Sequence, residues 1–86
     1  MHELSLALEV CRIAELNAQP HAAAAVRSVS VEIGADAGIE PDNFRFCLEA
    51  LLQAPPFAGA RLELVPCGGV DLRVSHLEVD DGRPDD

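Results

Sequence analysis

The sequence predicts a small α+β fold, a two-layer sandwich of two helices on a three-stranded sheet. Two kinds of periodicity predict it. Apolar residues recur every three or four positions in segments 4–14 and 44–51, which is typical of amphipathic helices. Apolar and polar residues alternate in segments 26–33, 60–65 and 70–79, which is typical of half-buried strands. The predicted order is therefore α-β-α-β-β.

The first helix carries an apolar stripe that we expect to face the core. Its members are Leu4, Ala7, Leu8, Cys11 and Ala14, widened by Leu6, Val10 and Ile13. Ser5, Glu9 and Arg12 mark the opposite, solvated face. The helix should end before Pro20, because the residue that precedes a proline disfavours helical backbone.

The first strand should have one buried and one solvated face. Its inward side chains are expected to be Val29, Val31 and Ile33, and its outward ones Ser28, Ser30 and Glu32. Residues 34–40 then turn. Pro41 stands in the first turn of the second helix, where proline is favoured.

The second helix has the core stripe Phe44, Cys47, Leu48 and Leu51, and Pro55-Pro56 ends it. The two later strands flank Gly68-Gly69, which predicts an antiparallel hairpin. A bulge near Ser75-His76 is expected, because the inward positions change from even to odd numbers there. The position of the first strand, edge or centre, is left open.

Composition bounds the class of protein. The 86 residues provide one core, so we expect a single domain over 1–79 and a disordered acidic tail over 80–86. The formal net charge of −9 argues against nucleic acid and anionic membranes as partners. Neither a membrane span nor a secretory signal is recognisable, so a cytoplasmic location is expected.

Motifs for zinc and for catalysis are missing. Cys11, Cys47 and Cys67 are far apart and form no Cys-x-x-Cys pair, so no structural zinc is expected. A phosphate-binding glycine loop and a Gly-x-Ser-x-Gly elbow are also absent. We therefore predict that the protein is not an enzyme.

The segment Met1-His2-Glu3 has the chemistry of a chelator. The terminal amine, the backbone nitrogen of His2 and its imidazole provide three nitrogen donors in nearly one plane, which suits Ni(II) and Cu(II). Glu3 could add a fourth donor, through its carboxylate or its backbone nitrogen. The helix that follows would hold these groups in place.

Several segments together resemble the HypA/HybF family of hydrogenase maturation factors. They are Met1-His2-Glu3-Leu4-Ser5-Leu6-Ala7, Val31-Glu32-Ile33-Gly34, Gly38-Ile39-Glu40-Pro41, Gly59-Ala60-Arg61-Leu62-Glu63, Leu72-Arg73-Val74 and Leu77-Glu78-Val79. The resemblance implies a nickel metallochaperone that works with a GTPase and delivers Ni(II) to the large subunit of [NiFe]-hydrogenase, or to urease.

By the same resemblance, His2 is the principal nickel ligand, with Met1 and Glu3 beside it. Glu40 and His76 are weaker candidates for a further donor. Family members also carry a zinc lobe between their last two strands, whereas here Pro66 runs directly into Cys67. Loss of that lobe leaves an alternative open, an adaptor without metal that docks on the GTPase or on a hydrogenase subunit. An exposed strand edge also leaves a homodimer open.

Overall fold

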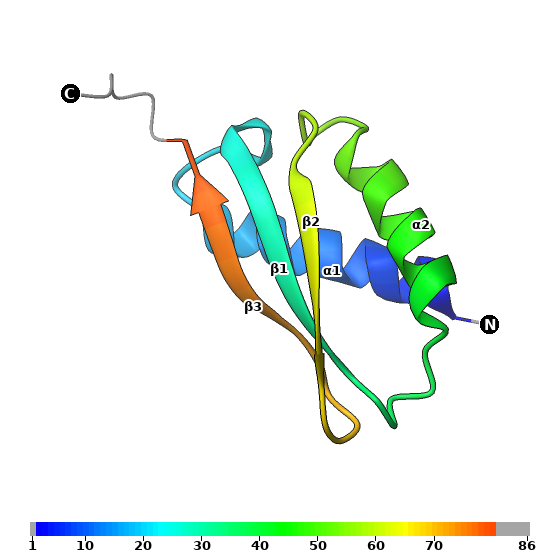
Figure 1. Ribbon diagram of the computed structural model, residues 1–86. Coiled ribbons are helices and arrows are strands. Elements are labelled where there is room, and N and C mark those ends of the chain that lie inside the picture. Colours follow the sequence, from blue (N-terminus) through cyan, green and yellow to red (C-terminus); the bar gives the residue numbers. More distant parts are fainter. Residues whose placement is uncertain (1, 81–86) are drawn as a thin grey trace.

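The computed structural model describes residues 2–80 and contains a helical layer and a sheet layer (Figure 1). The elements in chain order are α1 (Glu3–Ala18), a short 3-10 helix η1 (Ala23–Ala25), β1 (Val26–Gly34), α2 (Pro41–Leu52), β2 (Arg61–Cys67) and β3 (Leu72–Val79). The predicted two-layer α+β architecture and the α-β-α-β-β order are confirmed. Within residues 2–80, no helix combines the length and the apolar character needed to cross a membrane.

The strand order in the sheet is β2-β1-β3, so β1 is central. It runs parallel to β2 and antiparallel to β3. The predicted hairpin of the last two strands is therefore wrong, because β2 and β3 form opposite edges of the sheet. The physical reason is the crossover through α2, which brings β2 beside β1 in parallel orientation and leaves the far side of β1 to β3.

The connection between β2 and β3, residues 67–71, crosses over the carboxyl end of β1 (Figure 1). We call it the crossing loop. Three backbone hydrogen bonds hold it: Gly34 N to Asp71 O at 2.8 Å, Ala35 N to Cys67 O at 2.9 Å and Asp36 N to Gly69 O at 2.8 Å. A Cβ atom on residue 34 would lie 2.4 Å from the Gly69 carbonyl oxygen, so glycine is needed there.

β3 contains the predicted bulge. His76 lies opposite Ser30 and Val74 opposite Val31, so no β1 residue lies directly opposite Ser75, whose Oγ donates to Ser30 O at 3.3 Å. The bulge lets apolar residues of both halves of β3 face the helices. These residues, all partly buried against the core, are Leu72, Val74, Leu77 and Val79.

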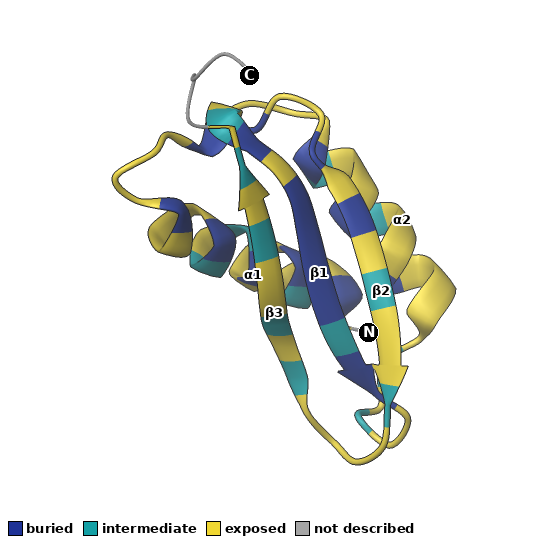
Figure 2. Ribbon diagram, turned by 60° about the vertical axis from the view of Figure 1, so that its left-hand side comes forward, coloured by how far each residue is buried: buried dark blue, intermediate teal, exposed yellow. Residues whose placement is uncertain are grey.

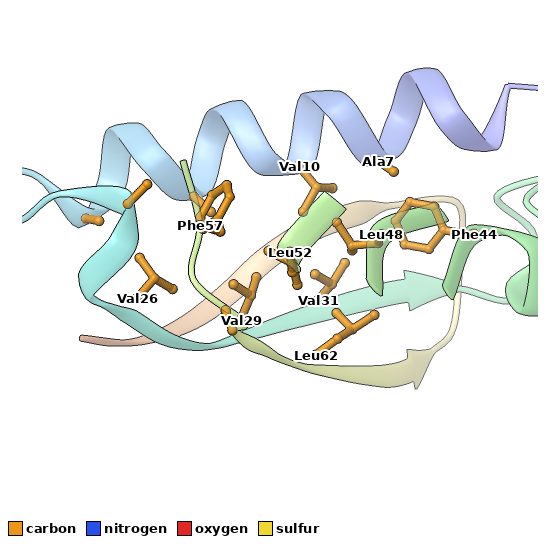
Figure 3. Close-up of a cluster of buried hydrophobic side chains, with 14 of the residues drawn as sticks. Ala7, Val10, Val26, Val29, Val31, Phe44, Leu48, Leu52, Phe57 and Leu62 are labelled. Carbon is orange, nitrogen blue, oxygen red and sulfur yellow. The ribbon is translucent and has the colours of Figure 1, made fainter. Parts of the chain in front are cut away.

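The core lies between the two helices and the inner face of the sheet (Figure 3). Phe44, Leu48 and Leu52 of α2 are fully buried, as are Val29 and Val31 of β1. The predicted inner face of β1 is confirmed. Of the predicted stripe of α2, Phe44 and Leu48 are fully buried and Cys47 and Leu51 partly buried, whereas Leu52 was not predicted.

α1 packs through a stripe that differs from the predicted one. Ala7, Val10 and Ala14 are buried, whereas Leu4 and Leu8 are 54% and 52% exposed. The prediction for these two leucines is wrong. Apolar residues surround most of α1, so periodicity alone does not select the face, and small alanine side chains allow the closest approach to the sheet.

The outer face of the sheet is polar, but its centre is covered (Figure 2). Ser28 and Ser30 were expected to be solvated and are instead buried, with 7% and 9% exposure. Ser28 Oγ donates to Glu78 Oε1 at 2.8 Å, and Ser30 Oγ donates to Glu63 Oε1 at 3.1 Å. Long side chains from both edge strands therefore lean over the short serines of β1.

Candidate metal centre at the start of α1

His2 occupies the N-cap position of α1 and is exposed. Its carbonyl oxygen accepts the first helical hydrogen bond, from Leu6 N at 2.9 Å. Its side chain forms no capping hydrogen bond. The His2 backbone is thus fixed at the start of a packed helix, and its exposed imidazole does not cap that helix.

The other predicted nitrogen donors are backbone groups. The terminal amine belongs to Met1, which lies outside the described residues. The first N–H groups of a helix have no carbonyl partner within it. A metal that displaced the His2 amide proton would therefore break no helical hydrogen bond of α1, whereas the Glu3 amide also donates to its own carboxylate.

Glu3 is the unexpected feature of this region. Its side chain is only 2% exposed, although it is charged. Its Oε2 accepts from Glu40 N at 3.1 Å, and its Oε1 accepts from Asn43 Nδ2 at 3.2 Å. The pKa of the Glu3 carboxyl is lowered, first by the hydrogen bond from the Glu40 amide and further by its own amide and Asn43, against the opposing effect of burial. Both carboxylate oxygens therefore serve to tie α1 to α2.

Glu40 is the N-cap of α2, and its Oε1 accepts from Asn43 N at 2.9 Å. Because its amide also contacts Glu3, the starts of the two helices lie side by side. Carboxylates at these positive helix ends are stabilising, and they offset the cost of a cation placed there. The Glu40 backbone therefore lies beside Glu3, while its carboxylate caps α2. Asn43, which joins the two glutamates, was not identified from the sequence.

His76 lies elsewhere. It is paired with Ser30 and shares a hollow of about 300 Å³ in the outer face of the sheet with Glu63 and Glu78. Asn17, near the far end of α1, lies beside the same part of β3. Fifteen helical residues separate Asn17 from His2, about 22 Å along the axis at 1.5 Å per residue. His76 therefore does not converge with His2.

Within residues 2–80, no three His, Cys, Asp or Glu side chains come together as a metal site. Cys11, Cys47 and Cys67 are free and half-buried, each in a different element. Burial, helped by the charge of Glu15, raises the pKa of the Cys11 thiol to about 11. Among the described residues, side chains alone therefore form no chelate.

Comparison with known proteins identifies the family. Residues 1–79 match the family model described as "Hydrogenase/urease nickel incorporation, metallochaperone, hypA". A hydrogenase maturation factor HypA of Rhodopseudomonas palustris (strain BisA53) is 44% identical over 69 residues, which cover 80% of this chain and 61% of the relative. HypA of Dechloromonas aromatica (strain RCB) is 38% identical with the same coverage. The chain spans less than two thirds of the length of these relatives.

A longer alignment shows that a relative covered over its full length is longer than this chain. HypA 2 of Bradyrhizobium diazoefficiens (strain USDA 110) is 38% identical in an alignment of 113 residues that covers 93% of this chain and all of the relative. Because this chain has 86 residues, that relative contains residues without a counterpart here. The family is described as one of metallochaperones, in agreement with the non-enzymatic role predicted from the sequence. The chain belongs to the HypA family of hydrogenase/urease nickel-incorporation metallochaperones.

Proposed function

We propose that this chain binds Ni(II) at its amino terminus and delivers it during maturation of [NiFe]-hydrogenase. The donors are the Met1 amine, the His2 backbone nitrogen and the His2 imidazole. The observation that carries this assignment is the exposed His2 imidazole without a capping bond, at the start of a helix in a chain of the nickel-incorporation family.

Glu3 contributes a fourth donor through its backbone nitrogen, since its carboxylate oxygens hold the start of α2. The ion would replace the proton that this nitrogen donates to the Glu3 carboxylate. The same carboxylate fixes the first turn of α1 against the start of α2. Glu40, whose backbone N–H binds the Glu3 carboxylate, is the further acidic residue that we assign to balancing the charge of the bound ion. Zinc has no place in this assignment, because the three thiols are dispersed.

An exposed chelate at a chain end suits a carrier, which has to release its cargo. Coordination requires a neutral amine, a neutral imidazole and a deprotonated amide, so nickel affinity should fall on acidification. Such a donor set binds Cu(II) more tightly than Ni(II). Selectivity for nickel in the cell then depends on metal supply and on the receiving partner.

Calorimetric titration with Ni(II) tests the site. His2→Ala should abolish tight binding while circular dichroism and thermal unfolding remain as in the wild type. Acetylation of the terminal amine should have the same effect on binding. Exposed His21 provides the matched control, and His21→Ala should bind nickel like the wild type. Equal nickel affinity of the wild type and His2→Ala would exclude the site.

The partners follow from the same assignment, namely the maturation GTPase and the hydrogenase large subunit, with urease as the other candidate recipient. One observation favours a second function, an adaptor without metal: Leu4 and Leu8, two and six residues after His2, expose about half of their surface. Titration of the GTPase into the chain, with and without Ni(II), separates the two. Partner binding by a chain with no measurable nickel affinity would favour the adaptor.

A further inference from the structure

The two edges of the sheet differ in their capacity to pair with another strand. β2 contains Pro66, which has no N–H group to donate, whereas β3 contains no proline. No further strand lies beyond β3 in the described chain (Figure 1). β3 is eight residues long, so it presents a long row of unpaired backbone groups.

The sequence of β3 reads almost as a mirror image of itself. From either end, the order is an apolar residue, a charged one, another apolar one and then a polar centre: Leu72-Arg73-Val74-Ser75 from one side and Val79-Glu78-Leu77-His76 from the other. The two charges at equivalent places have opposite signs. A strand of this kind is complementary to a second copy of itself in antiparallel orientation.

The bulge at Ser75 makes such pairing consistent with the two faces of the sheet. Residues opposite each other in an antiparallel pair point to the same face. With Ser75 opposite His76 of the second copy, Leu72 faces Val79 and Val74 faces Leu77, and all four face the helices. Shifting the register by one residue in either direction places an apolar side chain opposite a polar one.

In this register, Arg73 of each copy lies opposite Glu78 of the other. Arg73 uses its Nε to bind Glu32 Oε1 at 2.9 Å, which leaves its terminal NH groups available. Glu78 uses Oε1 for Ser28 and for Arg61, at 2.8 and 3.8 Å. The outer face would then carry the row Glu32, Arg73, Glu78 and Arg61 across the junction, with signs that alternate.

We propose that the chain forms a two-fold symmetric dimer in which the β3 edges of two copies pair antiparallel, with Ser75 opposite His76. The contact is isologous, so each favourable pair occurs twice. It joins two three-stranded sheets into one six-stranded sheet.

Charge reversal tests this interface, with sedimentation equilibrium of the metal-free full chain as the readout. Arg73→Glu alone and Glu78→Arg alone each place like charges opposite each other twice, so each should weaken self-association about tenfold or more. An equimolar mixture of the two variants places opposite charges at both positions. The mixture should therefore form a heterodimer of wild-type affinity.

Arg45→Glu is the matched control, because Arg45 is exposed on α2 and pairs with Glu49 of the same helix, away from β3. It should dimerise within about threefold of the wild type, and circular dichroism should show that all variants fold. A wild-type chain that remains monomeric at millimolar concentration would overturn the interface. A dimer that persists in both single variants, or a mixture that stays monomeric, would overturn it equally.

Discussion

Two regions of the molecule join segments that are far apart in the chain, and they do so by different means. At the start of α1, the Glu3 side chain binds Glu40 and Asn43 of the α2 start. At the crossing loop, only backbone groups of residues 34–36 and 67–71 are involved. The first junction therefore depends on the identity of particular side chains, and the second on whether the backbones can approach each other. Removing a side-chain group should therefore weaken the first junction, whereas adding side-chain atoms should weaken the second.

Gly34→Ala should have the largest effect. The added Cβ would lie 2.4 Å from Gly69 O and 3.0 Å from Asp71 N, both backbone atoms, so the crossing loop has to move. We expect a loss of about 2 kcal/mol in the free energy of unfolding, as for other overpacked sites. Urea denaturation measures it.

Gly68→Ala is the matched control, because a Cβ on residue 68 meets nothing within 4 Å. Its free energy of unfolding should stay within about 0.5 kcal/mol of the wild type. Equal losses in the two variants would show that close backbone approach is not what makes Gly34 necessary.

Glu3→Gln should change how stability depends on pH. The folded pKa of Glu3 is lowered below the unfolded value of about 4.3. The ionised carboxylate therefore stabilises the fold above that pH, and the stabilisation is lost as pH falls through the folded pKa. The variant should be less stable than the wild type at pH 7, and the difference should shrink on acidification toward pH 3.

Urea denaturation at a series of pH values measures this difference. Exposed Glu49 on α2 provides the control, and Glu49→Gln should leave the pH profile of stability close to that of the wild type. A constant difference between Glu3→Gln and the wild type from pH 7 to pH 3 would contradict the role assigned to the charged carboxylate.

Glu40→Ala should have a smaller effect. It removes the side chain that accepts from Asn43 N, and loss of an N-cap costs about 1 kcal/mol. The Glu40 backbone amide remains and can still donate to Glu3. Thermal unfolding should show the loss, and Glu40→Asp should recover most of it, because aspartate also caps helices well. A variant with unchanged melting temperature would mean that Pro41 alone sets the helix start.

The contrast between these regions also explains what could be predicted from the sequence. Local signals worked well: Pro41 at a helix start, the i, i+3, i+4 stripe of α2 and the change of phase that requires a bulge at Ser75 all lie within a few residues. The same holds for the exposed position of His2 at the start of a helix.

Long-range relations were predicted less well. The sheet order depends on a crossover that no short window contains, and the burial of Glu3 depends on partners about forty residues away. Ser28 and Ser30 are buried because side chains of two other strands cover them. In α1, the pattern assigned leucines and alanines alike to the core face, yet packing buries Ala7 and Ala14 and leaves Leu4 exposed.

Cys67→Ala should have the smallest effect, although Cys67 lies in the crossing loop. Only its carbonyl oxygen takes part in the junction, accepting from Ala35 N, and alanine retains that group. We expect a change within about 0.5 kcal/mol in the free energy of unfolding.

The same variant tests for zinc, because one thiol with no cysteine partner is not a structural zinc site. Mass spectrometry of the metal content should find no stoichiometric zinc in the wild type or the variant. Loss of bound zinc in Cys67→Ala, or destabilisation as large as that of Gly34→Ala, would show that the side chain of Cys67 takes part in the junction.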